Sequence, residues 1–358
     1  MQMRRLGRTG LQVAAIGCGG IPIFRAEKPE AVKVLRYAMD KGVNYFDTAR
    51  GYDKGGSEER LAEAIKGRRD EVVIASKATV RTRDEMMQSV EESLKTLGVD
   101  TIDIYKCHHV ITPEEWAQVS GPGGAMEALI EAREQGKIRF IGISGHRPEV
   151  LAEAVKSDMI DVLLVPFNFV KDEPATVLFP HTQAHDVGVT IMKPLGGSLF
   201  QHADICLRWI LQHEAVSTIC VGMWKMWEVD QNVMVGKNPE PLNPEELDWL
   251  ADERARWDRE YCRLCYTCEP NCKEDVPSRS LMILDLNYRR FGIKRMMAQG
   301  IDKQIAATAA CATCAHQSCI EDCDYHLPIP DLMRRIHRTY MPIVEAYNAR
   351  QGAAAQAG

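Results

Sequence analysis

Between residues 13 and about 235 the sequence repeats one pattern eight times: a short apolar run, then a longer amphipathic segment. The amphipathic segments, such as PEAVKVLRYAMDKG and RDEMMQSVEESLKTLG, have the apolar spacing that is typical of helices. The apolar runs are rich in β-branched residues, as expected of strands that are buried on both faces of a parallel sheet. The predicted strands are VAAIG (13–17), NYFDT (44–48), EVVIASK (71–77), IDIYKCH (102–108), RFIGIS (139–144), VLLVPFN (162–168), VTIMKPL (189–195) and STICVG (217–222).

Eight strand–helix units within about 230 residues favour a closed barrel over an open sheet. An open sheet that binds a dinucleotide would show G-x-G-x-x-G after its first strand, but GCGGIP ends in Pro22. We therefore predict an α/β fold, a (β/α)8 TIM barrel over residues 1–240. Residues 4–6 and 11–16 flank the turn GRTG and are predicted to form two strands around it.

The segment GKNPEPLNPEEL (236–247) is the predicted boundary, because proline and polar residues crowd there and Asn243-Pro244 is typical of a helix start. Residues 241–358 are then a second, smaller domain, which we expect to be mainly helical. Its tail NARQGAAAQAG (348–358) is small and polar and is predicted to fray.

Composition excludes several classes of function. The net charge of −6 comes from interspersed acidic and basic residues, so no basic stripe indicates nucleic-acid binding. No apolar run approaches the ~18 residues of a membrane span. The opening MRRLGRTGLQVAAIGCGG could be misread as an export signal, but polar residues and glycines at 7–10 and 12 interrupt it. We therefore expect a cytoplasmic protein, in which clustered thiols stay reduced.

Four residues with complementary chemistry fall at the ends of three successive predicted strands. Asp47 ends the second strand, Tyr52 follows in its loop, Lys77 ends the third and His108 ends the fourth. An ammonium near a phenol is expected to lower the phenol pKa from ~10 toward neutral pH, so that Tyr52 can exchange a proton. In this hypothesis Asp47 orients Lys77, and His108 hydrogen-bonds a substrate carbonyl.

These residues lie in segments that resemble the aldo-keto reductases: RRLGRTGLQVAAIGCGG, YFDTARGYDKGGSEERLAEAI, VVIASKA and DIYKCH. The resemblance covers roughly residues 1–235. It implies a reductase that transfers hydride from NAD(P)H to an aldehyde or ketone, with Tyr52 as general acid/base and Lys77, Asp47 and His108 in support. By its spacing from Asp103, His108 rather than His109 aligns with the family histidine.

The resemblance also implies a set of nicotinamide-nucleotide contacts. We expect them at Ser144, Asn168, Met192, Pro194, Leu195, Gly196, Gly222, Met223, Gln231 and Asn232. Four positions depart from the family pattern: Gly145 replaces an asparagine, Leu164 a glutamine, Met192 a stacking aromatic residue and Glu228 an arginine. A carboxylate at Glu228 would repel the 2′-phosphate of NADPH, with Lys225 as the residue that could compensate. The choice between NADH and NADPH therefore stays open.

Eight of the twelve cysteines form two runs near the end of the chain. The first run is C-x2-C-x2-C-x3-C, the spacing of bacterial ferredoxins, and the second is C-x2-C-x4-C-x3-C. Together they resemble a two-cluster ferredoxin module, in which the fourth cysteine of each run serves the other cluster. That resemblance predicts one [4Fe–4S] cluster on Cys262, Cys265, Cys268 and Cys323, and another on Cys311, Cys314, Cys319 and Cys272.

Two zinc sites or disulfides are the alternatives for these cysteines, but zinc favours two C-x2-C pairs that are separated by a longer gap. Three roles for clusters stay open: they could stabilise the second domain, sense oxidants, or feed single electrons to a substrate in the barrel. The rival functions are accordingly a ferredoxin-coupled reductase with an electron-transfer partner, and a nicotinamide-binding redox sensor without turnover.

Overall fold

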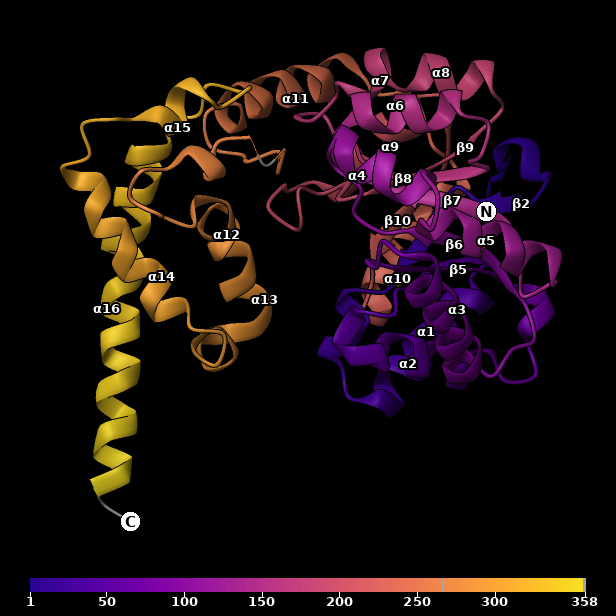
Figure 1. Ribbon diagram of the computed structural model, residues 1–358, viewed down its shortest axis with the longest axis horizontal. Helices are drawn as coiled ribbons and strands as arrows, with labels where there is room; N and C mark the ends of the chain where they lie inside the picture. Colours follow the sequence, from indigo (N-terminus) through magenta and orange to yellow (C-terminus); the bar gives the residue numbers. More distant parts are fainter. Residues whose placement is uncertain (266, 357–358) are drawn as a thin grey trace. The chain divides into compact units, whose positions relative to one another are not determined.

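The computed structural model describes residues 1–265 and 267–356, without the side chains at 285, 286, 289–291, 295 and 353–356. Contacts divide the chain into two compact units, Met1–Leu247 and Asp248–Gly358 (Figure 1). The first is a barrel of parallel strands surrounded by helices, and the described part of the second is built from helices and loops.

Eight parallel strands close the barrel in the order β10-β3-β4-β5-β6-β7-β8-β9, which confirms the predicted (β/α)8 fold. From β3 to β10 each strand pairs with the next one in the chain, and β10 returns to pair with β3, Ile219 opposite Ile16. Consecutive parallel strands require connections that cross outside the sheet, which is where the helices lie. The strands are β3 Ile16–Gly19, β4 Tyr45–Asp47, β5 Val73–Ala78, β6 Ile102–Cys107, β7 Ile138–Ser144, β8 Val162–Pro166, β9 Gly188–Met192 and β10 Val216–Gly222.

The N-terminal pair of strands is present as an antiparallel hairpin of β1, Met3–Arg5, and β2, Gln12–Ala14. The prediction of a single barrel strand over residues 13–17 is wrong, because the run is divided between two strands. Ala15 is the point of change: its N–H donates to the hairpin residue Gln2 (2.9 Å), and its carbonyl accepts from Ile219 of β10 (3.0 Å). The barrel strand therefore starts at residue 16.

Helices in the connections cover the outside of the barrel (Figure 1). The sequence sets their ends: α3 stops at Gly98, whose φ of 65° suits glycine, and α4 starts after Thr112, whose side chain accepts from the N–H of Glu115 (3.1 Å). The helices are α1 Lys28–Asp40, α2 Gly56–Ile65, α3 Arg83–Leu97, α4 Pro113–Ser120, α5 Ala125–Glu134, α6 Pro148–Lys156, α7 Pro174–Val177, α8 Phe179–Ala184, α9 Ala203–Leu211 and α10 Met226–Lys237.

Alternate side chains of each barrel strand face the inside. In β6 the Tyr105 hydroxyl lies 3.0 Å from Ser93 of α3, so Tyr105 faces the helices. Ile104, its neighbour, belongs to the apolar cluster inside the barrel. Lys106 and His108 share the alternation of Ile104 and therefore project toward the barrel interior, nearer its carboxyl end.

The second unit has a hydrophobic core of its own, which includes Leu281, Leu284, Ile305 and Met333. Its last helix continues to Gln356, through residues in which we expected fraying, and residues 357 and 358 lie outside the described part. The helices from the boundary onward are α11 Pro244–Trp257, α12 Ser278–Met282, α13 Leu284–Met297, α14 Ile301–Ala307, α15 Ser318–Glu321 and α16 Ile329–Gln356.

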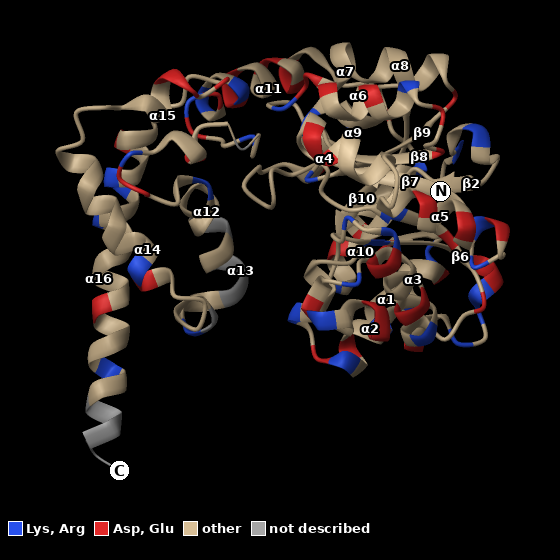
Figure 2. Ribbon diagram, viewed as in Figure 1, with Lys and Arg blue, Asp and Glu red and all other residues tan. Residues whose placement is uncertain are grey.

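Acidic and basic residues are interspersed along the helices of both units (Figure 2). Within the described ranges, no helix is both long enough and apolar enough to cross a membrane.

Candidate active site

The four residues expected to act in catalysis lie at the carboxyl ends of three neighbouring strands. Asp47 is the last residue of β4, Lys77 lies one residue before the end of β5, and His108 directly follows β6. Tyr52 opens a short 3-10 turn, Tyr52–Gly55, in the loop after β4. The fold therefore brings all four residues to the carboxyl end of the barrel, where barrel enzymes carry their catalytic residues.

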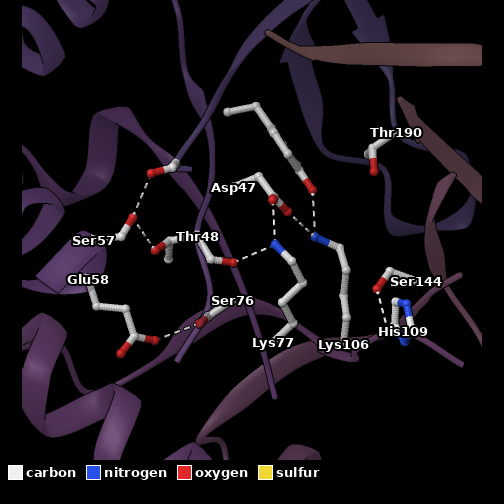
Figure 3. A network of polar contacts seen from close by, with 12 residues as sticks. Asp47, Thr48, Ser57, Glu58, Ser76, Lys77, Lys106, His109, Ser144 and Thr190 are labelled. Carbon is white, nitrogen blue, oxygen red and sulfur yellow. Dashed lines mark hydrogen bonds and ion pairs between the residues drawn. The ribbon is translucent and has the colours of Figure 1, made fainter. Parts of the chain in front are cut away.

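One buried carboxylate binds two buried ammonium groups at the centre of this arrangement (Figure 3). Lys77 Nζ donates to Asp47 Oδ1 at 2.5 Å, and Lys106 Nζ donates to Asp47 Oδ2 at 2.7 Å. Lys106 also donates to the Tyr45 hydroxyl at 3.2 Å. Sequence reasoning missed Lys106, although a lysine inside a strand that was predicted to be buried was a signal that could have found it.

These charges shift the pKa values of the cluster. Burial alone would raise the pKa of the Asp47 carboxyl, but Lys106 and Lys77 outweigh burial and hold that pKa below its usual value. The pKa of the Lys106 amine is lowered, because burial and repulsion from Lys77 together exceed the attraction of Asp47. Asp47 is consequently ionised at neutral pH.

Tyr52 lies with the Lys77 ammonium over the face of its ring, 4.7 Å from the ring centroid. The prediction of a lowered phenol pKa is wrong for this arrangement: burial raises the pKa of Tyr52 well above its ordinary value, and the Asp47 carboxylate raises it further. The physical reason is that Lys77 directs its hydrogen bonds to Asp47 and to the Thr48 carbonyl, at 2.6 Å. The phenol is therefore protonated at neutral pH, as a proton donor must be.

His108 is the histidine beside Tyr52, with ring centroids 5.9 Å apart in an edge-to-face arrangement. Burial, and then the Lys77 ammonium, lower the pKa of His108 well below its ordinary value. The ring is thus a neutral imidazole, which can donate one hydrogen bond to a carbonyl oxygen. His109 instead lies next to His146, at 5.2 Å between centroids.

A second polar network fixes the loop that carries Tyr52 (Figure 3). Glu58 of α2 is fully buried and accepts from Ser76 of β5 at 2.6 Å. It also accepts from Arg50 at 2.8 Å. The Thr48 hydroxyl donates to Ser57 at 2.9 Å, and the Arg50 N–H donates to the carbonyl of Lys77 at 3.0 Å. Hydrogen bonds at both ends of the loop restrict where Tyr52 can lie.

The departure from the family pattern at Gly145 has a steric cause. A Cβ atom at Gly145 would lie 2.2 Å from the carbonyl oxygen of Val110, so an asparagine does not fit unless the backbone moves. The same close approach places the His109 N–H 3.1 Å from the hydroxyl of Ser144, which accepts its hydrogen bond. Ser144, an expected nicotinamide contact, therefore also supports the loop after β6.

Asn168, another expected contact, has an amide that joins two loops. Its Oδ1 accepts from the N–H groups of Val170 (3.0 Å) and Lys171 (2.8 Å), and its Nδ2 donates to the carbonyl of Lys193 (3.1 Å). The remaining expected contacts lie at the ends of β9 and β10 or in α10. Met192, Pro194, Leu195 and Gly196 end or follow β9, Gly222 ends β10 and Met223 follows it, and Gln231 and Asn232 lie in α10.

Glu228 does not stand free to repel a phosphate. Its carboxylate accepts from the N–H groups of Trp224 (2.8 Å) and Lys225 (3.0 Å), and so satisfies the N-terminus of α10. Arg25, at the end of the turn Pro22–Arg25, places its guanidinium 5.7 Å from the centre of the Trp224 ring. Its Nε and Nη2 atoms are buried without a hydrogen-bond partner in the described residues. No signal in a single sequence marks Arg25.

Comparison with known proteins agrees with this geometry. Residues 15–204 match the model of the aldo/keto reductase family. The chain belongs to this family of oxidoreductases. Its barrel is similar to an aldo-keto reductase of Bacillus halodurans in its holo form, with 25% identity and a TM-score of 0.62 over 70% of this chain and 96% of that one. An aldo/keto reductase of Klebsiella pneumoniae, solved with NADP and acetate, gives a TM-score of 0.61 at 25% identity over 71% and 96%.

Two curated proteins are also similar to this chain, over different extents. An uncharacterized oxidoreductase of Bacillus subtilis is 31% identical over 56% of this chain and 66% of its own length. The L-galactose dehydrogenase of Arabidopsis thaliana is 26% identical over 69% of this chain and 91% of its own length. The family match thus ends within the barrel, before both cysteine runs.

Beyond the aldo/keto reductase barrel, the eight clustered cysteines form two groups that each draw on both runs. One pocket is lined by Cys262, Cys265, Cys268 and Cys323. In the other group, burial and repulsion from three thiols raise the pKa of Cys319 to about 11. Those three are Cys272, Cys311 and Cys314. Among the described residues, no three His, Cys, Asp or Glu side chains are placed to hold one metal ion.

Replacing Asp47 with asparagine is expected to destabilise the protein at neutral pH, because two buried ammonium groups lose their counterion. Removal of one partner from a buried ion pair costs about 3–5 kcal/mol. The lowered pKa of Asp47 means that its contribution is present above the unfolded-state pKa of ~3.9 and is lost as the pH falls through the folded-state value. Urea unfolding of wild type and D47N at a series of pH values measures this difference.

The matched control is D40N, which removes the exposed Asp40 carboxylate and its surface bridge to Arg68. We expect D40N to change the free energy of unfolding by less than about 1 kcal/mol. A gap between wild type and D47N that stayed constant from neutral to strongly acidic pH would contradict the assignment of an ionised Asp47.

Proposed function

We propose that the protein is an NAD(P)H-linked reductase of an aldehyde or ketone, with Tyr52 as its proton donor. The observation that supports this most is the convergence of Tyr52, Lys77 and His108 around the buried Asp47 at the carboxyl end of the barrel. The family to which the chain belongs consists of oxidoreductases, and a solved relative binds NADP.

In the proposed reaction the carbonyl carbon gains a hydride and the carbonyl oxygen gains a proton. A nicotinamide nucleotide bound there would supply the hydride. The neutral His108 ring donates a hydrogen bond to the carbonyl oxygen and orients it. Tyr52 gives its phenolic proton to the same oxygen, and the Lys77 ammonium beside the ring stabilises the phenolate that is left.

The residues near Arg25 fit an anionic nucleotide. Buried N–H groups of an arginine are normally hydrogen-bonded, so the Nε and Nη2 atoms of Arg25 indicate a place for an acceptor that the described residues do not supply. Arginine binds phosphate oxygens well because its guanidinium is planar and always charged. With Glu228 committed to the start of α10, we propose that Arg25 provides the positive charge for the 2′-phosphate of NADPH.

Tyr52→Phe is expected to lower kcat for carbonyl reduction by at least about 100-fold, since general acid catalysis contributes on that scale. Nucleotide binding should stay within about twofold of wild type, because the change removes one oxygen atom. The measurement combines steady-state kinetics on a panel of aldehydes with fluorescence titration of NADPH. Substantial reductase activity in Y52F would exclude Tyr52 as the proton donor.

Arg25→Met is expected to raise the KM for NADPH by about tenfold, the loss of about one charge-assisted hydrogen bond, and to leave the KM for NADH nearly unchanged. Kinetics with both nucleotides measure the ratio, and the exposed Lys237→Met at the end of α10 is the control for the loss of a positive charge. Equal effects on both nucleotides would place Arg25 away from the 2′-phosphate.

We also propose that the second unit binds two [4Fe–4S] clusters in a reducing cytoplasm. The donor set fits: each group offers four thiols, the ligand number of such a cluster. Six of these eight cysteines, three from each group, also belong to the hydrophobic core of the second unit or pack against it: Cys262, Cys268, Cys272, Cys311, Cys319 and Cys323. This placement favours a role in holding that unit together. A bound cluster would supply one-electron redox capacity.

Which cysteines belong to which cluster can be tested by measuring the iron content of cysteine-to-serine variants. Cys265→Ser and Cys323→Ser should each disrupt the same cluster, and Cys314→Ser and Cys272→Ser the other, which lowers iron from about eight to about four per chain. Anaerobic iron and sulfide analysis with EPR spectra measures this, and the barrel variant Cys206→Ser is the control. If C323S gave the EPR spectrum of C314S instead of that of C265S, the proposed ligand sets would be wrong.

The same EPR experiment separates the competing roles of the clusters. If added NADPH reduces the clusters, electrons pass from the nucleotide to the second unit. This result would favour the role in which the clusters deliver electrons. Clusters that change nucleotide affinity on oxidation, in a protein that reduces none of the aldehydes, would indicate a redox sensor.

A further inference from the structure

Lys106 is a buried charge that the proposed reaction does not yet use. Its side chain is fully buried, and Nζ donates to Asp47 and Tyr45. The titratable groups around it come from three strands and from the residue after β6. They are Asp47 and Tyr45 of β4, Lys77 of β5, Cys220 of β10 and His108, which follows β6.

The charges inside the barrel do not balance while Tyr52 keeps its proton. Burial raises the pKa values of Tyr45 and Cys220, so both are neutral, and His108 is a neutral imidazole. One carboxylate, Asp47, then faces two ammonium groups. An uncompensated charge in a buried site is unfavourable, because burial removes the water that would solvate it.

Proton donation by Tyr52 removes this imbalance. When the phenol gives its proton to the substrate oxygen, a phenolate remains beside Lys77. Two ammonium groups then face two anions, Asp47 and Tyr52. With a single lysine the same step would turn a neutral cluster into one with a net negative charge. The second lysine therefore favours the state after proton donation over the state before it.

We propose that Lys106 is a positioning residue that acts through Asp47 and Lys77: it takes one oxygen of the shared carboxylate, so that the charge of Lys77 stabilises the Tyr52 phenolate. The geometry supports this directly, since the two lysines bind different oxygens of Asp47, Oδ1 and Oδ2. The inference rests on the proposed function, in which Tyr52 is the proton donor. A merely structural lysine, which fills space and satisfies Tyr45, is the alternative to exclude.

Lys106→Met separates charge from packing, because methionine has a similar length and no charge. We expect the phenolate of Tyr52 to form at a pH about one unit higher than in wild type, the low end of the effect of a nearby opposite charge. We also expect kcat for carbonyl reduction to fall about tenfold, which corresponds to one pKa unit. Lys106→Arg, which keeps the charge, should restore most of both.

Two readouts are needed. The first is the ultraviolet absorbance of tyrosinate during a pH titration of the NADP-bound protein, taken as the difference from the same titration of Y52F, which needs no turnover. The second is the pH profile of kcat. Lys156→Met, which removes an exposed lysine of α6, is the control, and its titration should coincide with that of wild type. If K106M does not fold, Lys106→Gln is the second neutral variant, since its amide can still bond to Asp47.

A neutral variant whose Tyr52 titration and pH profile coincide with those of wild type would overturn the inference, whatever its stability. So would a Lys106→Arg variant that behaved like K106M. Failure of the proposed function looks different: wild type would reduce no carbonyl with NADPH, or Y52F would remain active, while the absorbance titration could still show whether Lys106 controls the phenol.

Discussion

The carboxylate of Asp47 is the group on which the geometry of the catalytic end depends. It lies on β4 and accepts hydrogen bonds from the ammonium groups of Lys77 on β5 and Lys106 on β6. Three adjacent strands are thus joined inside the barrel by charge as well as by their backbone hydrogen bonds. Because all three groups are buried, their positions are restricted by the closed sheet around them, and the direction in which Lys77 can point follows from that restriction.

The loop that carries Tyr52 is held by a separate set of contacts. Glu58 of α2 accepts a hydrogen bond from Ser76 of β5, and Ser57 of α2 accepts one from Thr48, which follows β4. Arg50, in the loop itself, donates to Glu58. The phenol therefore lies between two sets of polar contacts: the Asp47–Lys77–Lys106 cluster inside the barrel, and the hydrogen bonds that hold its own loop. This division explains how a side chain on a loop can have a defined position relative to groups on strands.

The sequence predicted the barrel well because, in each of the eight units, the apolar run of the strand differs clearly from the helical periodicity of the segment after it. The ends of the strands could be placed from the apolar runs. Asp47, Lys77 and His108 followed from those ends. The division of residues 13–17 between two strands could not be predicted, since Ala15 changes partners only in three dimensions. Lys106 was visible as a lysine in a strand that was predicted to be buried, but its role depends on Asp47, which another strand places beside it. Three findings are properties of packing, which a single sequence does not express: the hydrogen bonds of Glu228 at a helix start, the two Arg25 nitrogens without a hydrogen-bond partner among the described residues, and the crowding at Gly145.

The division of the cysteines into two groups bears on how the second unit is made. Cys323 lies with three residues that precede it by more than fifty positions, and Cys272 lies with three that follow it. Neither set of thiols is therefore complete while the ribosome is still synthesising the stretch before residue 311. The first set is complete only once Cys323 has left the ribosomal tunnel, and the second only once Cys319 has, so each set joins thiols that emerge at well-separated times. All barrel strands precede residue 223 and therefore both cysteine runs, so the barrel can form before either set of thiols is complete.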